Sequence, residues 1–198
     1  MPTFTHTLEP LSLPSNIRIL QPPRAPLQHV TADSPALEVM TDLAKVRLIT
    51  ITSEVSVDTA LAAMIHAKVR LLLVTGEQGV ITGLVSAQDL MGEKPLRIAS
   101  DERIRHEDVQ VAQVMSRVEN IRPLELREVE HAAVRDIVRH LIDDNKQHAL
   151  VVSATDDLAR YTACGIFSLT QISRQLGETI SLSESPAQSF AEFERLIG

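Results

Sequence analysis

Residues 39–41 read Val-Met-Thr, and about 75 residues later residues 114–116 read Val-Met-Ser. Each triplet precedes a stretch that alternates like a β-strand, residues 48–52 in the first copy and 121–126 in the second. Self-similarity at a fixed separation is the signature of a duplicated structural unit. The two triplets therefore mark the starts of two related units.

The same order of predicted elements follows each triplet. Apolar residues then recur at helical spacing: Val57, Ala60, Leu61, Met64 and Ile65 in the first copy, and Val134, Ile137, Val138, Leu141 and Ile142 in the second. Aliphatic runs at 71–74 and 149–152 predict strands that are buried on both faces. After a turn, third strands are expected at 80–86 and 161–168, and a short helix closes each copy.

Each copy is thus a strand–helix–strand–strand–helix unit of the α/β class. One such unit is too small to bury both faces of its sheet, so we expect two units packed sheet to sheet with pseudo-twofold symmetry. The predicted repeats span residues 35–92 and 109–177, and the charged residues 93–108 link them.

Both ends of the chain differ from the repeats. Residues 1–34 are rich in proline, which removes hydrogen-bond donors and blocks helix, so they predict an extended arm. Residues 178–198 form a tail that is expected to end in an amphipathic helix. The apolar face of that helix would consist of Phe190, Phe193, Leu196 and Ile197.

Composition excludes several classes of protein. The net charge of −7 argues against a general attraction to nucleic acid or to an anionic membrane, and 3% aromatic residues offer few platforms for stacking on bases. The single cysteine, Cys164, forms no intrachain disulfide and fits a reducing compartment. Because no apolar run has the length of a signal peptide or a membrane span, we expect a cytoplasmic protein.

Residues 83–89, Gly-Leu-Val-Ser-Ala-Gln-Asp, form the sharpest motif in the chain. They place the Ser86 hydroxyl and the Asp89 carboxylate where a strand meets a helix. The hydroxyl and the helix N-terminus suit a phosphate, and the carboxylate suits the two hydroxyls of a ribose. The same spacing is also that of a capping box, in which both side chains only satisfy backbone donors. Both interpretations stay open at the level of sequence.

Taken together, the triplet, the order of elements and the Gly-Leu-Val-Ser-x-x-Asp motif resemble the cystathionine-β-synthase (CBS) domain. The resemblance covers residues 36 to about 176. Members of that family occur as pairs that form a disc with two clefts, which often bind adenosine derivatives. The resemblance implies a stand-alone regulatory pair, a Bateman module, and a homodimer.

The resemblance also implies two sets of site residues. In the first cleft, residues of the motif would face residues of the second repeat: Leu84, Ser86, Asp89, Ile121, Leu126, Gln147 and His148. The second cleft would contain Ile49, Val69, Arg70, Ser168 and Gln171. Gln171 stands where the family has the ribose carboxylate, and a neutral amide holds a diol less well. We therefore expect one competent cleft and one altered cleft.

Arg70 and His148 fall near positions where basic side chains reach phosphates in nucleotide-binding members of the family. A surface salt bridge is the alternative for Arg70, and a hydrogen-bonded core or edge histidine is the alternative for His148. If His148 meets a phosphate, its charge would make binding sensitive to pH near neutrality.

The leading functional hypothesis is a regulatory module that binds an adenine nucleotide, AMP, ADP or ATP, in the cleft of Ser86 and Asp89. The alternative is a ligand-free structural or protein-interaction module that dimerises or binds a partner the sequence does not identify. A third hypothesis places S-adenosylmethionine or a dinucleotide in the same cleft. No catalytic constellation and no His or Cys pair at metal-binding spacing is present in the sequence, so we expect neither an enzyme nor a metal site, and no required cofactor.

Overall fold

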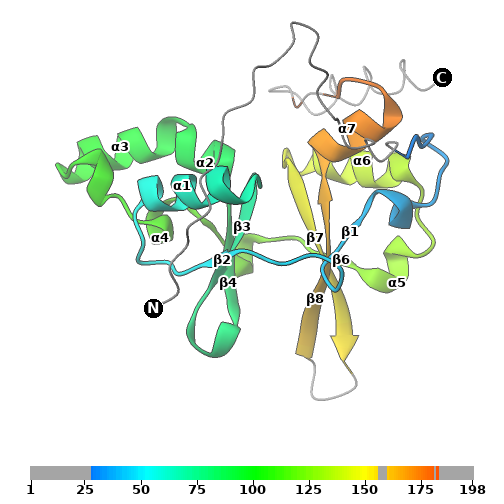
Figure 1. Cartoon of the computed structure of the whole chain (residues 1–198), viewed down its shortest axis with the longest axis horizontal. Helices are drawn as coiled ribbons and strands as arrows, with labels where there is room; N and C mark the ends of the chain where they lie inside the picture. The colour runs from blue at the N-terminus through cyan, green and yellow to red at the C-terminus, as the bar shows by residue number, and fades with distance from the viewer. Residues whose placement is uncertain (1–27, 156–159, 181, 183–198) are drawn as a thin grey trace, which may run out of the picture.

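The computed structural model describes residues 28–155, 160–180 and 182 of the chain (Figure 1). Most of the predicted N-terminal arm and the predicted helix near the C-terminus lie outside these residues. The described residues are a mixed α/β structure in which two four-stranded sheets stand side by side, each with its helices on the side away from the other (Figure 1).

The predicted order of elements is confirmed in both repeats. The first repeat consists of β2 (Thr50–Ile51), α1 (Val57–Ala67), β3 (Leu71–Thr75), β4 (Ile81–Ser86) and α2 (Ala87–Met91). The second repeat consists of β6 (Leu124–Glu125), α6 (Val134–Asp143), β7 (His148–Thr155), β8 (Arg160–Ser168) and α7 (Leu169–Leu176). The first strand of each repeat is shorter than predicted, because only two residues of each stretch pair with the neighbouring strand.

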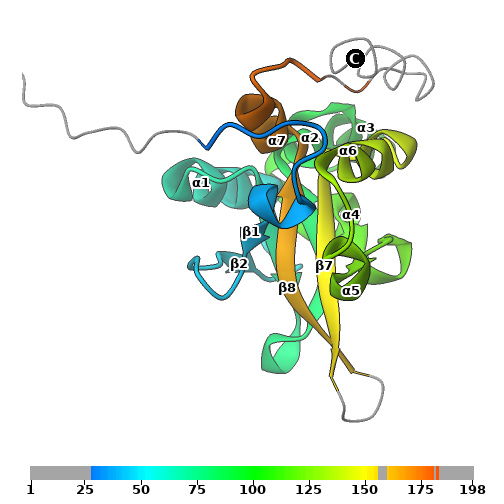
Figure 2. The ribbon, with the colours of Figure 1, turned by 90° about the vertical axis from the view of Figure 1, so that its right-hand side faces the viewer.

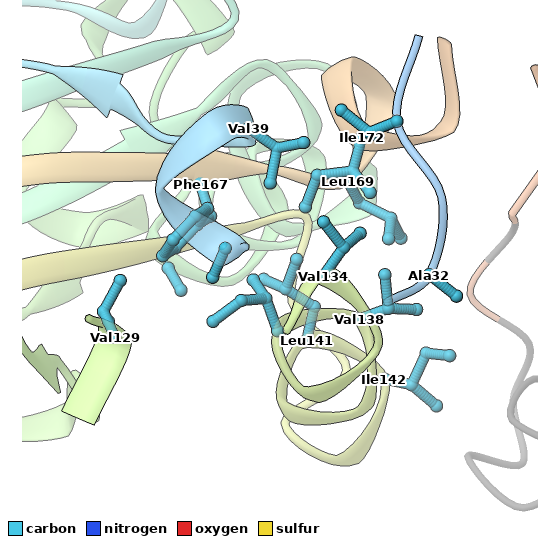
Figure 3. Close-up of a cluster of buried hydrophobic side chains, with 14 of the residues drawn as sticks. Ala32, Val39, Val129, Val134, Val138, Leu141, Ile142, Phe167, Leu169 and Ile172 are labelled. Atoms are coloured by element: carbon cyan, nitrogen blue, oxygen red, sulfur yellow. The ribbon is translucent and has the colours of Figure 1, made fainter. Parts of the chain in front are cut away.

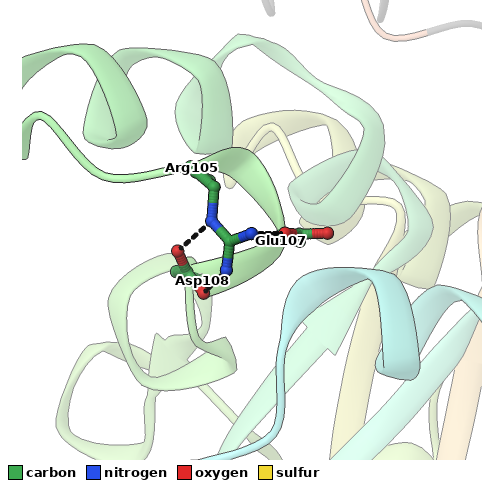
Figure 4. A network of polar contacts seen from close by, with 3 residues as sticks. All are labelled: Arg105, Glu107 and Asp108. Atoms are coloured by element: carbon green, nitrogen blue, oxygen red, sulfur yellow. Dashed lines mark hydrogen bonds and ion pairs between the residues drawn. The ribbon is translucent and has the colours of Figure 1, made fainter.

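The segment between the repeats is more ordered than a plain linker. It contains the ten-residue helix α3 (Glu93–Glu102) and a 3-10 turn, η3 (His106–Asp108). Arg105 makes polar contacts within this turn. Its Nε donates to Asp108 Oδ2 over 2.9 Å, and its guanidinium also pairs with Glu107 (Figure 4). These ion pairs are exposed and add little stability, so their effect is to shape the turn.

Short segments then exchange between the two repeats. The order of the first sheet is β2-β3-β4-β5, and that of the second is β1-β8-β7-β6. Strand β5 (Ser116–Arg117) lies in the first segment of the second repeat but pairs antiparallel with β4 of the first. Strand β1 (Thr41–Asp42) lies in the first segment of the first repeat but pairs antiparallel with β8 of the second. Each repeat therefore supplies the edge strand of the other repeat's sheet.

The exchange continues upstream of both edge strands. Val57 N–H donates to the Val109 carbonyl over 2.9 Å, and Ala36 N–H donates to the Ala132 carbonyl over the same distance. The 3-10 helix η1 (Ala36–Val39) accordingly packs in the core of the second repeat (Figure 2), and the helix α4 (Val111–Val114) packs in the core of the first. The crossing segments thus contribute side chains as well as backbone pairing.

The residues of each strand alternate between two cores. In β3, Leu72 and Val74 point to the helices of their own repeat, whereas Leu73 joins a small cluster between the sheets. The second repeat has the same division, and its helix-side core is the larger one (Figure 3). The buried residues of the cluster between the sheets are Leu73, Leu84 and Leu150. It confirms that the repeats pack sheet to sheet.

The methionine of each Val-Met triplet covers a glycine in the other repeat's sheet. A Cβ atom at Gly83 would lie 2.7 Å from the carbonyl oxygen of Ser116 and 3.0 Å from Met115 Sδ. At the related position in the second sheet, a Cβ atom at Gly165 would overlap the Met40 side chain. The two glycines leave the space that the exchanged segments fill.

We expect Gly83→Ala to lower the free energy of unfolding by about 1–3 kcal/mol, the usual cost of overpacking. Its new methyl group meets a backbone oxygen, which can move only if β5 shifts. Gly165→Ala should cost less, since the atoms it meets belong to a flexible methionine side chain. Urea unfolding of both variants measures the difference, and a wild-type midpoint for Gly83→Ala would contradict the close packing of β5.

Candidate functional site

Two cavities lie between the repeats. Cavity A has a volume of about 630 Å³ and contains residues of the Ser-x-x-Asp motif. Cavity B has a volume of about 590 Å³ and contains Ser168 and Gln171, the related positions of the second repeat. Both volumes are within the range of small-molecule sites.

Cavity A brings together all but one of the residues predicted for the first cleft. These are Leu84, Ser86 and Asp89 from the first repeat, and Ile121, Gln147 and His148 from the second. Leu126 is the exception: it opens the short helix α5 (Leu126–Val129) and packs against the core of the second repeat. The strand expected over 121–126 is confined to Leu124–Glu125, and Leu126 follows it into that helix, so only Ile121 reaches the cavity.

Ser86 and Asp89 form the capping box that the sequence left open. Ser86 Oγ accepts from the Asp89 N–H over 3.2 Å, and Asp89 Oδ2 accepts from the Ser86 N–H over 2.8 Å. The Ser86 hydroxyl also donates to Asp89 Oδ2 over 2.6 Å. Both residues nevertheless line the cavity, and no hydrogen bond from the described residues reaches Asp89 Oδ1. Capping and ligand binding are therefore compatible at Asp89.

The charges around cavity A are mixed. Its carboxylates are Asp89, Glu93, Asp143 and Asp144, and its cations are Lys94, Arg122 and Lys146. Two of the cations are already engaged: Arg122 pairs with Asp144 at 2.5 Å, and Lys94 Nζ donates to the Val114 carbonyl over 2.6 Å. The free charge that faces cavity A is therefore mainly negative.

Cavity B contains every residue predicted for the second cleft: Ile49, Val69, Arg70, Ser168 and Gln171. Besides Arg70, three further cationic side chains line cavity B: Arg47, Lys68 and Arg174. None of its lining residues is acidic. Arg70 therefore lies at a cavity and pairs with no carboxylate among the described residues. Arg47, Lys68 and Arg174 were missed from the sequence, since they come from a loop, a helix end and a different repeat.

The amide of Gln171 serves as a structural contact. Thr41 Oγ1 of the exchanged strand donates to Gln171 Oε1 over 3.3 Å, and Gln171 Nε2 contacts Gln175 Oε1 at 3.5 Å. The Ser168 side chain does not cap α7 as Ser86 caps α2. The two related positions have therefore diverged in geometry as well as in charge.

His148 lines both cavities, at the start of β7. Burial and, to a smaller extent, the charge of Arg70 lower the pKa of His148 to about 4, although the charge of Asp89 acts in the opposite direction. The imidazole is therefore neutral at pH 7 in the protein without a ligand, and the pH sensitivity expected when His148 meets a phosphate stays a prediction.

Cys164, the single cysteine, lines neither cavity. Burial raises the pKa of the Cys164 thiol, and Cys164 Sγ contacts the Val151 carbonyl at 3.5 Å. Within residues 28–155, 160–180 and 182, no group of three or more His, Cys, Asp or Glu side chains could hold a metal ion. Over the same ranges, none of the helices combines the length and the apolar character needed to cross a membrane.

We expect His148→Gln to flatten the dependence of stability on pH. Between pH 6.5 and 4, His148 is protonated in the unfolded chain but stays neutral in the folded protein. The free energy of unfolding of the wild type therefore falls as the pH is lowered through this interval. Relative to the variant, the loss should reach about 2–3 kcal/mol near pH 4. Denaturant unfolding at several pH values measures it, with His66→Gln on the exposed face of α1 as the matched control. Parallel curves for wild type and His148→Gln would contradict the burial of a neutral imidazole.

The comparisons with known proteins agree with this architecture. Residues 36–95 match the family model of the CBS domain. An uncharacterised conserved protein from Pyrococcus horikoshii has a TM-score of 0.53 at 18% identity, with 78% of this chain and 100% of that chain covered. The CBS domain of a bacterial CNNM/CorC family Mg²⁺ transporter, in complex with an inhibitor, has a TM-score of 0.51 at 18% identity. The match covers 76% of this chain and 80% of that chain. CBSX2 of Arabidopsis thaliana, in complex with AMP, has a TM-score of 0.49 at 20% identity. The match covers 71% of this chain and 94% of that chain.

At these identities the similarity to solved structures shows the fold alone. The comparison with curated protein sequences gave no significant match. The family model rests on the sequence of the first repeat, and the solved structures cover both repeats. The first repeat is therefore a CBS domain, and the chain as a whole has the fold of a CBS-domain pair.

Proposed function

We propose that this chain is a regulatory module that binds an adenine nucleotide, AMP, ADP or ATP, in cavity A between its two repeats. The observation that supports this most is the position of Ser86 and Asp89 in a cavity whose opposite wall comes from the second repeat. A ligand that contacts both repeats shifts their arrangement if it binds one arrangement more tightly than the others, and such a shift would turn binding into a signal.

The lining of cavity A offers a partner for each part of a nucleotide. Leu71, Leu84 and Ile121 provide an apolar surface for the base. Asp89 Oδ1 is the acceptor for the ribose hydroxyls, because Oδ2 already accepts from Ser86. Lys146 lines the cavity, has no side-chain partner among the described residues and is the candidate cation for a phosphate. Ser86 would have to turn its hydroxyl away from Asp89 before it could donate to a phosphate.

The surplus of carboxylates in cavity A favours a second candidate ligand, S-adenosylmethionine. This ligand keeps the adenosine that Asp89 would bind and replaces the phosphates by a methionine part with a sulfonium, an amino group and a carboxylate, so its net charge is positive. Positive charge on the ligand suits Glu93 and Asp143, for which the described residues show no cationic partner. Calorimetric titration with AMP, ATP and S-adenosylmethionine separates the two candidates.

We expect Asp89→Asn to weaken binding of the ligand by roughly 1–3 kcal/mol, the scale of a lost charge-assisted hydrogen bond. Asparagine keeps the size of the side chain and an acceptor for the Ser86 N–H, so the cap of α2 is largely preserved. The measurement is calorimetric titration of wild type and variant with the tightest of the three ligands.

Asp136→Asn is the matched control. Asp136 Oδ2 accepts from the Ala133 N–H over 2.9 Å at the start of α6, so it caps a helix as Asp89 does, but it lines neither cavity. Its variant should bind with wild-type affinity. Equal affinities of wild type and Asp89→Asn would contradict the assignment of the ribose site. A thermal-shift screen in which no adenosine derivative raises the melting temperature would favour a ligand-free interaction module instead.

Homodimerisation belongs to the same proposal. Ile65 on α1 and Met91 on α2 expose 70% and 63% of their surface, and a second copy would cover such apolar side chains. We expect the double change Ile65→Glu and Met91→Glu to shift the molar mass in light scattering from dimer to monomer. Arg135→Glu on the exposed face of α6 is the control, and a wild-type mass for the double variant would show that these helices do not form the interface.

A further inference from the structure

Cavity B combines positive charge with an exposed apolar rim. The rim consists of Val46, Leu48 and Val69, which expose 43%, 38% and 36% of their surface. Among the described residues, no ion pair and no side-chain hydrogen bond engages the four cationic groups of this cavity. A small hydrophilic anion would leave the rim in contact with water. An acidic segment with an apolar face would cover the rim and balance the charge at the same time.

The chain itself carries a segment of this character. Residues 183–198 lie outside the described residues, and their sequence predicts an amphipathic helix. At helical spacing, Glu192 and Glu194 would flank the apolar face of that helix on opposite sides. With Glu184, the segment has three carboxylates against the single cation Arg195. The predicted apolar face consists of Phe190, Phe193, Leu196 and Ile197.

The described chain leads into this segment from beside cavity B. Helix α7 forms one wall of the cavity and is capped by Gly177, whose φ is 76°. The chain then folds back onto α7. Glu178 N–H donates to the Ser173 carbonyl over 3.0 Å, and Ile180 N–H donates to Ser173 Oγ over 3.4 Å. The residues of α7 that line cavity B are Thr170, Gln171, Arg174 and Gln175.

The segment is long enough to cover the cavity. Leu182 packs against the core of the second repeat, so the starting point of the segment is fixed. Residues 183–185 span about 10 Å when extended, and a helix over 186–197 is about 18 Å long. A helix about 10–12 Å across is too large for a cavity of about 590 Å³. It would therefore lie over the mouth and insert only side chains.

We propose that residues 183–198 dock over cavity B of their own chain. Phe190 and Phe193 enter the apolar rim, and the flanking carboxylates pair with the cations of the cavity. The segment is thus an intramolecular cover that closes cavity B to other ligands. The contact does not depend on the proposed function, since the nucleotide would occupy cavity A.

A single fluorescent reporter tests the contact in the full chain, because the protein contains no tryptophan. The emission of Phe193→Trp should lie well to the blue of its value in urea, since the indole is buried in the rim. Adding Arg47→Glu and Arg174→Glu, which reverse two exposed cations of cavity B, should shift the emission to the red. An emission equal to that of the unfolded chain, or one unchanged by the charge reversal, would overturn the proposal.

Two control pairs in the same reporter background show where the segment lies. Arg97→Glu with Arg127→Glu changes the overall charge equally at exposed positions outside both cavities, and should leave the emission unchanged. An equal red shift in this pair would mean that only the overall charge matters, and the site would be wrong. A red shift with Ile65→Glu and Met91→Glu alone would place the segment on α1 and α2, which also contradicts the proposal.

Paramagnetic broadening locates the segment without any change in cavity B. A nitroxide at Ala191→Cys, in a Cys164→Ala background, would stand on the predicted helix away from its apolar face. It should broaden the amide signals of Val46 and Val69 more than that of Arg122, which lines only cavity A. The reverse order, or no broadening at either place, would contradict the proposal.

Mixed samples distinguish the segment of the same chain from that of a second copy. With the nitroxide on one molecule and the nitrogen-15 label on another, the signals around cavity B should stay sharp. Equal broadening in the mixed sample would show that the segment comes from a second copy, and the intramolecular contact would be wrong.

Asp89→Asn keeps this test apart from that of the proposed function. Asp89 lines cavity A only, so the substitution should leave the emission of the reporter unchanged. If no adenosine derivative binds but the reporter still responds to the charge reversal, the proposed function fails and the contact stands. If nucleotide binding depends on Asp89 but the reporter is exposed to water throughout, the contact fails and the proposed function stands.

Discussion

The backbone pairing of each repeat with the segment that leads into the other holds this structure together. Strand β5 completes the sheet of the first repeat, and β1 completes that of the second. The pairing covers the edge of a hairpin in each sheet and sets the two sheets face to face around Leu73, Leu84 and Leu150. Both cavities lie between the repeats, so their shape depends on this exchange.

Pseudo-twofold symmetry places similar backbone at both cavities, but the side chains have diverged. In cavity A, Asp89 caps a helix and keeps one carboxylate oxygen free. In cavity B, Gln171 contacts Thr41 of the exchanged strand, and four cations surround the space. The sequence alone suggested one competent and one degenerate cleft. In the structure, cavity A is lined by carboxylates and cations together, whereas cavity B is lined by cations and by no carboxylate.

Much of the fold could be predicted from the sequence because a duplicated pattern constrains both copies at once. The buried strands and the amphipathic helices were identified by their periodicity. The exchanged strands were missed, since two residues are too few to show an alternation. Leu126 was placed in the wrong environment because the expected strand gives way to a helix there. The low pKa of His148 and the cluster of Arg47, Lys68 and Arg174 depend on three-dimensional proximity, which no local pattern reports.

The exchange of edge strands has a consequence for the smallest unit that can exist alone. A half-length chain cut between α3 and η3 would keep β2, β3 and β4 but would lose β5 and the apolar residues Val109, Val111 and Val114. Its sheet would end in an open edge, which readily recruits strands from other molecules. Such a fragment could complete its fold only by pairing with the missing segment of another molecule, so the two halves would be stable only as a complex.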